Sequence, residues 1–118
     1  MEDWCQRFPE IDAVISVNDG MALGGIEALK AAGRDVANME IYGIDGLADG
    51  CLSIEAGELK MTVLQDAQVM GYNGVDLAMK MAMGEMKEAT IMEVTPELIN
   101  ADNVDEFLEM HRENGIIS

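Results

Sequence analysis

Two periods of apolar residues alternate along the chain, and together they predict alternating strands and helices. Short runs rich in β-branched residues are typical of buried strands, and they occupy residues 12–17, 39–44 and 60–64. Between them the apolar residues lie three or four positions apart, as on one face of a helix, over residues 18–33, 47–57 and 66–84. Because the two patterns alternate strictly, we predict an α/β fold: a three-layer sandwich in which helices flank a mostly parallel sheet.

The end of the chain carries weaker signals. A fourth short strand is expected at residues 91–94, Pro96 interrupts regular structure, and residues 98–99 resume an extended segment. A final helix is expected to begin at residue 102 or 103 and to end at Gly115. Its apolar face consists of Val104, Phe107, Leu108 and His111. The methionines that cluster in the predicted helices are expected to fill a core.

The chain opens inside a helical pattern. Trp4 and Phe8 are four positions apart, as on the apolar face of a helix that leads into the first strand, yet no helix-start signal precedes them. An α/β unit normally supplies a strand before such a helix. We therefore expect residues 1–118 to form a single carboxyl-terminal lobe of something longer.

Composition and charge narrow the classes of function. The 118 residues are 49% hydrophobic, which is enough for the core of one domain. With 7 basic and 23 acidic residues the formal charge is −16, which argues against nucleic acid and anionic membranes as partners. The apolar runs are far shorter than the roughly 20 residues that a membrane-spanning helix needs, and we expect no insertion into a membrane. Cys5 and Cys51 are expected to be idle thiols, with a mutual disulfide left open.

A polar side chain follows each of the three best strands, at the point where the strand ends. Asn18 follows the first strand, Asp45 the second and Gln65 the third. The carboxyl ends of parallel strands meet at one edge of a sheet, and ligands of open α/β sheets bind there. We therefore predict that these three residues converge on one rim. The alternative is that they are ordinary loop and helix-cap residues, since Asn and Asp are common helix caps.

Two amides and a carboxylate suit a neutral ligand that carries several hydroxyl groups. A carboxylate accepts hydrogen bonds from hydroxyls, whereas each amide both donates and accepts. A phosphate ligand would need Arg, Lys or a glycine-rich cradle, and the predicted rim contains none of these. We predict ligand binding by Asn18, Asp45 and Gln65, with no cofactor, no metal site and no catalytic residue.

Three sequence blocks carry a family resemblance. They are VNDGMALG at residues 17–24, GIDG at residues 43–46 and TVLQD at residues 62–66. In this order and spacing they resemble the carboxyl-terminal lobe of type I periplasmic sugar-binding proteins, whose ribose- and galactose-binding members are the most similar. In such proteins the Asn of the first block, the Asp of the second and the Gln of the third contact the ligand, so the resemblance points again to Asn18, Asp45 and Gln65.

The resemblance also implies how the lobe works. The sugar would lie between two lobes, and residues 96–101 would approach the hinge that joins them. This chain would supply a half-site, because the amino-terminal lobe and the first strand of this lobe are absent from it. The complete protein would be the periplasmic or extracellular (lipoprotein-anchored) component of an ABC importer that delivers its sugar to a permease. The truncated lobe, with an open sheet edge, could also self-associate.

Three other classes of protein are alternatives to a sugar-binding lobe. The effector-binding lobe of a LacI-type transcriptional regulator shares this fold and is the main alternative. A receiver-like or flavodoxin-like domain has a similar length, but a receiver needs a lysine on a late strand and none follows Val94. An enzyme is not expected: His111 is the only histidine, and its position on a terminal helix predicts a packing role remote from the rim. The glycines also lack the spacing of a dinucleotide-binding loop.

Overall fold

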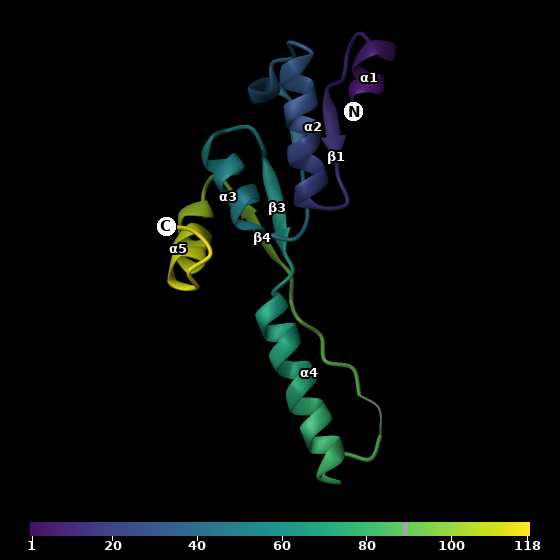
Figure 1. Cartoon of the computed structure of the whole chain (residues 1–118), viewed down its shortest axis with the longest axis vertical. Helices are drawn as coiled ribbons and strands as arrows, with labels where there is room; N and C mark the ends of the chain where they lie inside the picture. Colours follow the sequence, from purple (N-terminus) through teal and green to yellow (C-terminus); the bar gives the residue numbers. More distant parts are fainter. Residues whose placement is uncertain (89) are drawn as a thin grey trace.

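The computed structural model describes residues 1–88 and 90–118 as an α/β fold (Figure 1). The strands are β1 (Ala13–Ile15), β2 (Glu40–Tyr42), β3 (Met61–Leu64) and β4 (Glu97–Asn100). The α-helices are α1 (Glu2–Arg7), α2 (Asp19–Ala31), α3 (Ala48–Glu55), α4 (Ala67–Ala82) and α5 (Val104–Glu113), and a short 3-10 turn, η1, covers Val36–Asn38. The predicted alternation of strands and helices is confirmed through α4.

The four strands form one sheet in the order β1-β2-β3-β4. The first three are parallel and β4 is antiparallel to β3, with Thr62 opposite Ile99. The predicted fold class, a mostly parallel sheet flanked by helices, is confirmed. The predicted position of the fourth strand was wrong, because residues 91–94 carry no regular structure and the strand begins at Glu97, directly after Pro96.

Pairing and burial explain the position of β4. Pro96 has no amide hydrogen to donate to a neighbouring strand, so regular pairing starts after it. Ile99 is completely buried against the core, whereas Ile91 in the expected strand is 89% exposed. Burial of Ile99 opposite Thr62 therefore selects residues 97–100 over an earlier run of similar strand propensity.

The core lies on one face of the sheet. Side chains alternate between the two faces of each strand, and Ile41, Thr62 and Ile99 are fully buried on the same face. Helices α2, α3 and α5 cover that face with Ala22, Ile26, Leu29, Ile54, Phe107 and Leu108. On the other face Ile15 and Leu98 are exposed. Because removing about 100 Å² of apolar surface from water contributes roughly 2.5 kcal/mol, the side chains packed on this face stabilise the lobe.

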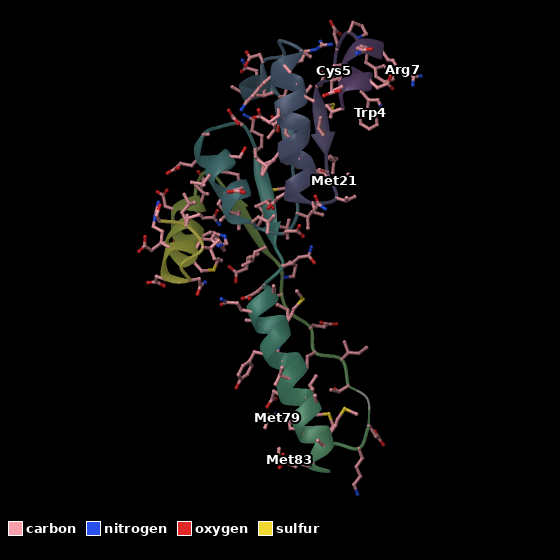
Figure 2. The ribbon with its side chains drawn as sticks, viewed as in Figure 1. Trp4, Cys5, Arg7, Met21, Met79 and Met83 are labelled. Atoms are coloured by element: carbon pink, nitrogen blue, oxygen red, sulfur yellow. The ribbon has the colours of Figure 1, made fainter. Side chains whose placement is uncertain are left out.

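Helix α4 stands apart from the rest of the chain. It projects from the sheet (Figure 1), and none of its residues is buried. Tyr72, Val75 and Met79 are 74%, 63% and 57% exposed, and Met79 and Met83 lie near its far end (Figure 2). The Cα radius of gyration is 18.2 Å, against roughly 13 Å for a compact domain of this length. The expectation that these methionines fill a core within this chain was wrong.

The two cysteines form no disulfide with each other. Cys5 and Cys51 are both free thiols, as expected, and Cys51 is buried in the core. Within the described residues, every helix is too short or too polar to cross a lipid bilayer.

Candidate functional site

Main-chain hydrogen bonds place the three predicted site residues along one edge of the sheet. The amide of Asp19, next to Asn18, donates to the Ile44 carbonyl at 2.7 Å. The amide of Asp45 donates to the Val63 carbonyl at 2.9 Å, and the amide of Gln65 donates to the Asp45 carbonyl at 3.3 Å. Asn18, Asp45 and Gln65 therefore follow adjacent parallel strands at their carboxyl ends. We call this edge the rim.

Two of the three side chains touch each other. Gln65 Nε2 donates to Asp45 Oδ1 at 3.1 Å. Asp45 is half-buried and Gln65 is exposed, so both remain open to a ligand. Asp45 has a φ of +122°, which L side chains rarely adopt, and Gly46 follows it with a φ of +69°. A Cβ on Gly46 would lie 2.8 Å from the Leu64 Cα, so only glycine fits this turn.

Asn18 has a structural role that the sequence left open. Its Oδ1 accepts the Met21 amide hydrogen at 2.8 Å and caps α2. At the third strand end it is Asp66, not Gln65, that caps the following helix, by accepting from the Val69 amide at 2.9 Å. The alternative interpretation, that the rim residues are helix caps, is therefore confirmed for Asn18, whereas Gln65 caps no helix. The amide nitrogen of Asn18 makes no hydrogen bond within the described residues and could still donate to a ligand.

Asp19 is a buried carboxylate that sequence reasoning did not select for the site. It is fully buried and accepts hydrogen bonds from the Thr62 hydroxyl at 2.6 Å and from the Leu47 amide at 2.8 Å. Burial raises the pKa of the Asp19 carboxyl above its ordinary value of 3.8, although these hydrogen bonds act in the opposite direction. In the sequence, the only feature that points to Asp19 is its position directly after Asn18. Because Asn and Asp cap helices equally well, this position does not show which of the two is buried.

His111 lies at the rim, which contradicts the predicted remote position. Its side chain is only 6% exposed, and Nε2 lies 3.0 Å from the Gly46 carbonyl oxygen. The reason is that α5 packs across α3, so that the last turn of α5 reaches the turn that precedes α3. The sequence signal was present, because His111 continues the buried face of Val104, Phe107 and Leu108.

A cavity of about 370 Å³ opens beside Asp45 and Gln65. It lies between the starts of α3 and α4 and the end of α5, and its walls include Leu47, Met70 and Ile116. Apolar walls with a few convergent polar groups are typical of small-molecule sites. Among residues 1–88 and 90–118, no cluster of three or more His, Cys, Asp or Glu side chains is placed to hold a metal ion.

An α/β lobe with polar side chains along the carboxyl edge of its parallel strands is a typical small-molecule-binding domain. Residues 1–86 match the family described as the periplasmic binding protein domain, and the chain belongs to this family. The predicted family resemblance is therefore confirmed. The similar proteins are named as binding proteins and give no support to the alternative of a LacI-type regulator.

The similar proteins are ligand-binding proteins. The chain is 43% identical over 107 residues to a candidate rhizopine-binding protein of Rhizobium meliloti, covering 91% of this chain and 34% of that protein. It is 38% identical over 110 residues to the xylitol-binding protein of Mycolicibacterium smegmatis, covering 92% and 31%. A solved ABC transporter solute-binding protein of Bacillus halodurans, with bound myo-inositol, superposes with a TM-score of 0.83 at 35% identity, covering 92% and 37%. The chain thus spans about a third of these proteins' lengths.

Proposed function

We propose that this chain is the ligand-contacting carboxyl-terminal lobe of an ABC-importer solute-binding protein for a neutral sugar or polyol. Asn18, Asp45 and Gln65 are the proposed ligand contacts, and binding is not followed by any chemical change of the ligand. The observation that carries the proposal is the Asp45–Gln65 pair, held at the rim and open to solvent. The family membership and the polyols named for its relatives support the same class of ligand.

The hydrogen-bonding capacity of the rim fits hydroxyl groups. Gln65 Nε2 already donates to Asp45 Oδ1, which leaves Asp45 Oδ2 to accept from a hydroxyl and Gln65 Oε1 to accept from another. The Asn18 amide nitrogen supplies a donor. With a chain charge of −16, the surrounding field disfavours anionic ligands and leaves neutral polyols unaffected.

A second lobe would complete the site. Helix α4 is apolar on most of its surface yet exposed, and such helices are normally buried against a partner. It leaves the sheet at Asp66 and the chain returns at Pro96, and both residues line a cavity of about 350 Å³ beside the rim. We propose that α4 packs on an amino-terminal lobe, that residues 96–101 approach the hinge, and that the two lobes close on the ligand. The complete protein would work outside the cytoplasmic membrane and dock on a permease.

Calorimetry on a two-lobed form tests this proposal. The two-lobed form is this chain grafted in place of the matching third of the M. smegmatis xylitol-binding protein. We expect it to bind at least one of xylitol, myo-inositol and D-ribose. In Asp45→Ala, the lost hydrogen bonds to a charged group cost about 1.5–3 kcal/mol, which weakens binding roughly 10- to 150-fold.

The matched control is Asp49→Ala, which removes an exposed carboxylate from the first turn of α3. We expect its affinity to equal that of the parent protein. The proposal is wrong if the parent two-lobed form binds none of the three compounds, or if Asp45→Ala and Asp49→Ala bind equally well.

A further inference from the structure

The turn that carries Asp45 is fixed by side chains from elements far away in the sequence. This turn, residues 45–47, links β2 to α3. Its conformation is unfavourable for a residue with a side chain, because Asp45 has a φ of +122°. Surrounding contacts must therefore hold the turn in place.

Each peptide group after Asp45 has a partner outside the turn. The Gly46 amide donates to the Thr62 hydroxyl at 3.2 Å, and the Leu47 amide donates to Asp19 Oδ2 at 2.8 Å. The Gly46 carbonyl lies 3.0 Å from His111 Nε2. Because a carbonyl oxygen only accepts, the ring proton is on Nε2 and His111 donates. Three elements, α2, β3 and α5, therefore clamp one turn.

Asp19 is itself held in a fitted niche. Its Oδ1 accepts from the Thr62 hydroxyl at 2.6 Å, so one carboxylate connects β3 with the turn. Gly43 and Gly50 lie against it, and a Cβ at Gly50 would lie 2.6 Å from Asp19 Oδ2. The carboxylate cannot shift without moving the backbone around it, so the Leu47 amide has a fixed acceptor.

The buried position of His111 is unfavourable for one of its two ring nitrogens. Its Nδ1 is buried and has no hydrogen-bond partner within the described residues. A buried ring nitrogen without a partner destabilises a fold, and an apolar residue would fill this position of α5 without that penalty. Among the described residues, the contact to Gly46 is the one polar interaction of the His111 side chain that leucine could not make.

We propose that Asp19 and His111 are positioning residues for ligand binding: they fix residues 45–47 so that the Asp45 carboxylate faces the ligand. This inference rests on the proposed function for the role of Asp45. It extends the site from the three rim residues to two buried groups: Asp19 on α2 is fully buried, and His111 on α5 is 6% exposed and borders the cavity beside Asp45. Helix α5 is then part of the binding machinery and not only a cover for the core.

Amide hydrogen exchange in the 118-residue chain tests the clamp without any ligand. We expect His111→Ala to accelerate exchange at Gly46 and Leu47, and His111→Gln, which keeps an N–H donor, to restore protection. The matched control is Val104→Ala, which opens a cavity on the same buried face of α5 without touching the turn. Equal exchange at Gly46 and Leu47 in His111→Ala and Val104→Ala would overturn the clamp.

A double-mutant cycle in the two-lobed form separates positioning from general stability. With xylitol, myo-inositol or D-ribose as the probe, we expect His111→Ala to weaken binding about 2- to 10-fold, as for one lost hydrogen bond. In the Asp45→Ala background His111→Ala should have no further effect on affinity, because His111 influences binding only by positioning the Asp45 carboxylate. In the Asn18→Ala background it should keep its full effect.

The outcomes distinguish the two proposals. If His111→Ala weakens binding equally in the Asp45→Ala background, His111 acts through general stability and the positioning inference is wrong. If the parent two-lobed form binds none of the probes, the proposed function fails, while exchange at Gly46 and Leu47 still decides whether the turn is clamped. Asp19→Ala provides a second test, because it removes the acceptor of the Leu47 amide; unchanged protection at Leu47 would exclude Asp19 from the clamp.

Discussion

Replacing Thr62 by valine tests the buried network beneath the rim. Thr62 is fully buried, and its hydroxyl donates to Asp19 Oδ1 and accepts from the Gly46 amide. Valine has nearly the same shape, so Thr62→Val removes these two hydrogen bonds without opening a cavity. The lost hydroxyl leaves a buried carboxylate oxygen and a buried amide unsatisfied.

The expected loss follows from those two groups. A hydrogen bond to a charged group contributes about 1.5–3 kcal/mol, and an unsatisfied buried amide costs about 1–3 kcal/mol. The two contributions are not strictly additive, and we expect the free energy of unfolding to fall by about 2–5 kcal/mol. Domains of this size are stable by only about 5–15 kcal/mol, so the effect is large.

Urea unfolding followed by circular dichroism measures this loss. The midpoint should fall for Thr62→Val with an unchanged slope. Thr95→Val, at an exposed position, is the matched control and should change stability by less than about 0.5 kcal/mol. Thr62→Ser keeps the hydroxyl and should be less destabilised than Thr62→Val. If Thr62→Val is as stable as Thr95→Val, the hydroxyl does not support the network.

The remaining predictions concern ionisation and reactivity. Burial, together with the nearby charge of Asp19, raises the pKa of the Cys51 thiol to about 11. At pH 8 a thiol reagent should therefore label only Cys5 until urea unfolds the chain. Labelling of Cys51 in the folded chain would contradict its burial. The raised pKa of Asp19 means that the folded chain binds this proton more tightly than the unfolded chain, whose value is near 3.8. The resulting stabilisation is complete below pH 3.8 and is lost as the pH rises through the raised value. The stability of the parent chain relative to Asp19→Asn should therefore increase as the pH is lowered from 7 toward 4, and a constant difference would disprove the raised pKa.

Much of the rim follows from local pattern. Short β-branched runs followed by helical spacing place Asn18, Asp45 and Gln65 at strand ends, and parallel pairing brings strand ends to one edge. The position of β4 could not be predicted in this way, because residues 91–94 and 97–100 have similar strand propensity. Only the burial of Ile99 opposite Thr62 separates the two runs.

The buried network depends on tertiary contacts. Asn18 and Asp19 have equal preference for the helix cap, and the niche formed by Gly43 and Gly50 decides which one is buried. The apolar spacing of the last helix predicts that His111 faces inward. Its contact with Gly46 depends on how α5 crosses α3, which no local pattern in the sequence encodes.

The exposure of α4 could not be predicted from the local sequence pattern either. Apolar spacing predicts that a helix packs against something, but it does not say whether the partner lies within the same lobe. Here Tyr72, Val75 and Met79 are exposed, and the observed core of the described residues does not include them, contrary to the expectation that the helix methionines fill a core.

A polyol site at the rim can be tested by a nuclear magnetic resonance titration of the two-lobed form with the polyol that it binds in calorimetry. We predict that the side-chain amides of Asn18 and Gln65 and the backbone amide of Asp45 shift together and saturate with one affinity. The side-chain amide of Asn38, on the exposed turn η1, should not move. Saturating ligand that leaves Asn18, Asp45 and Gln65 unshifted would contradict a polyol site at the rim.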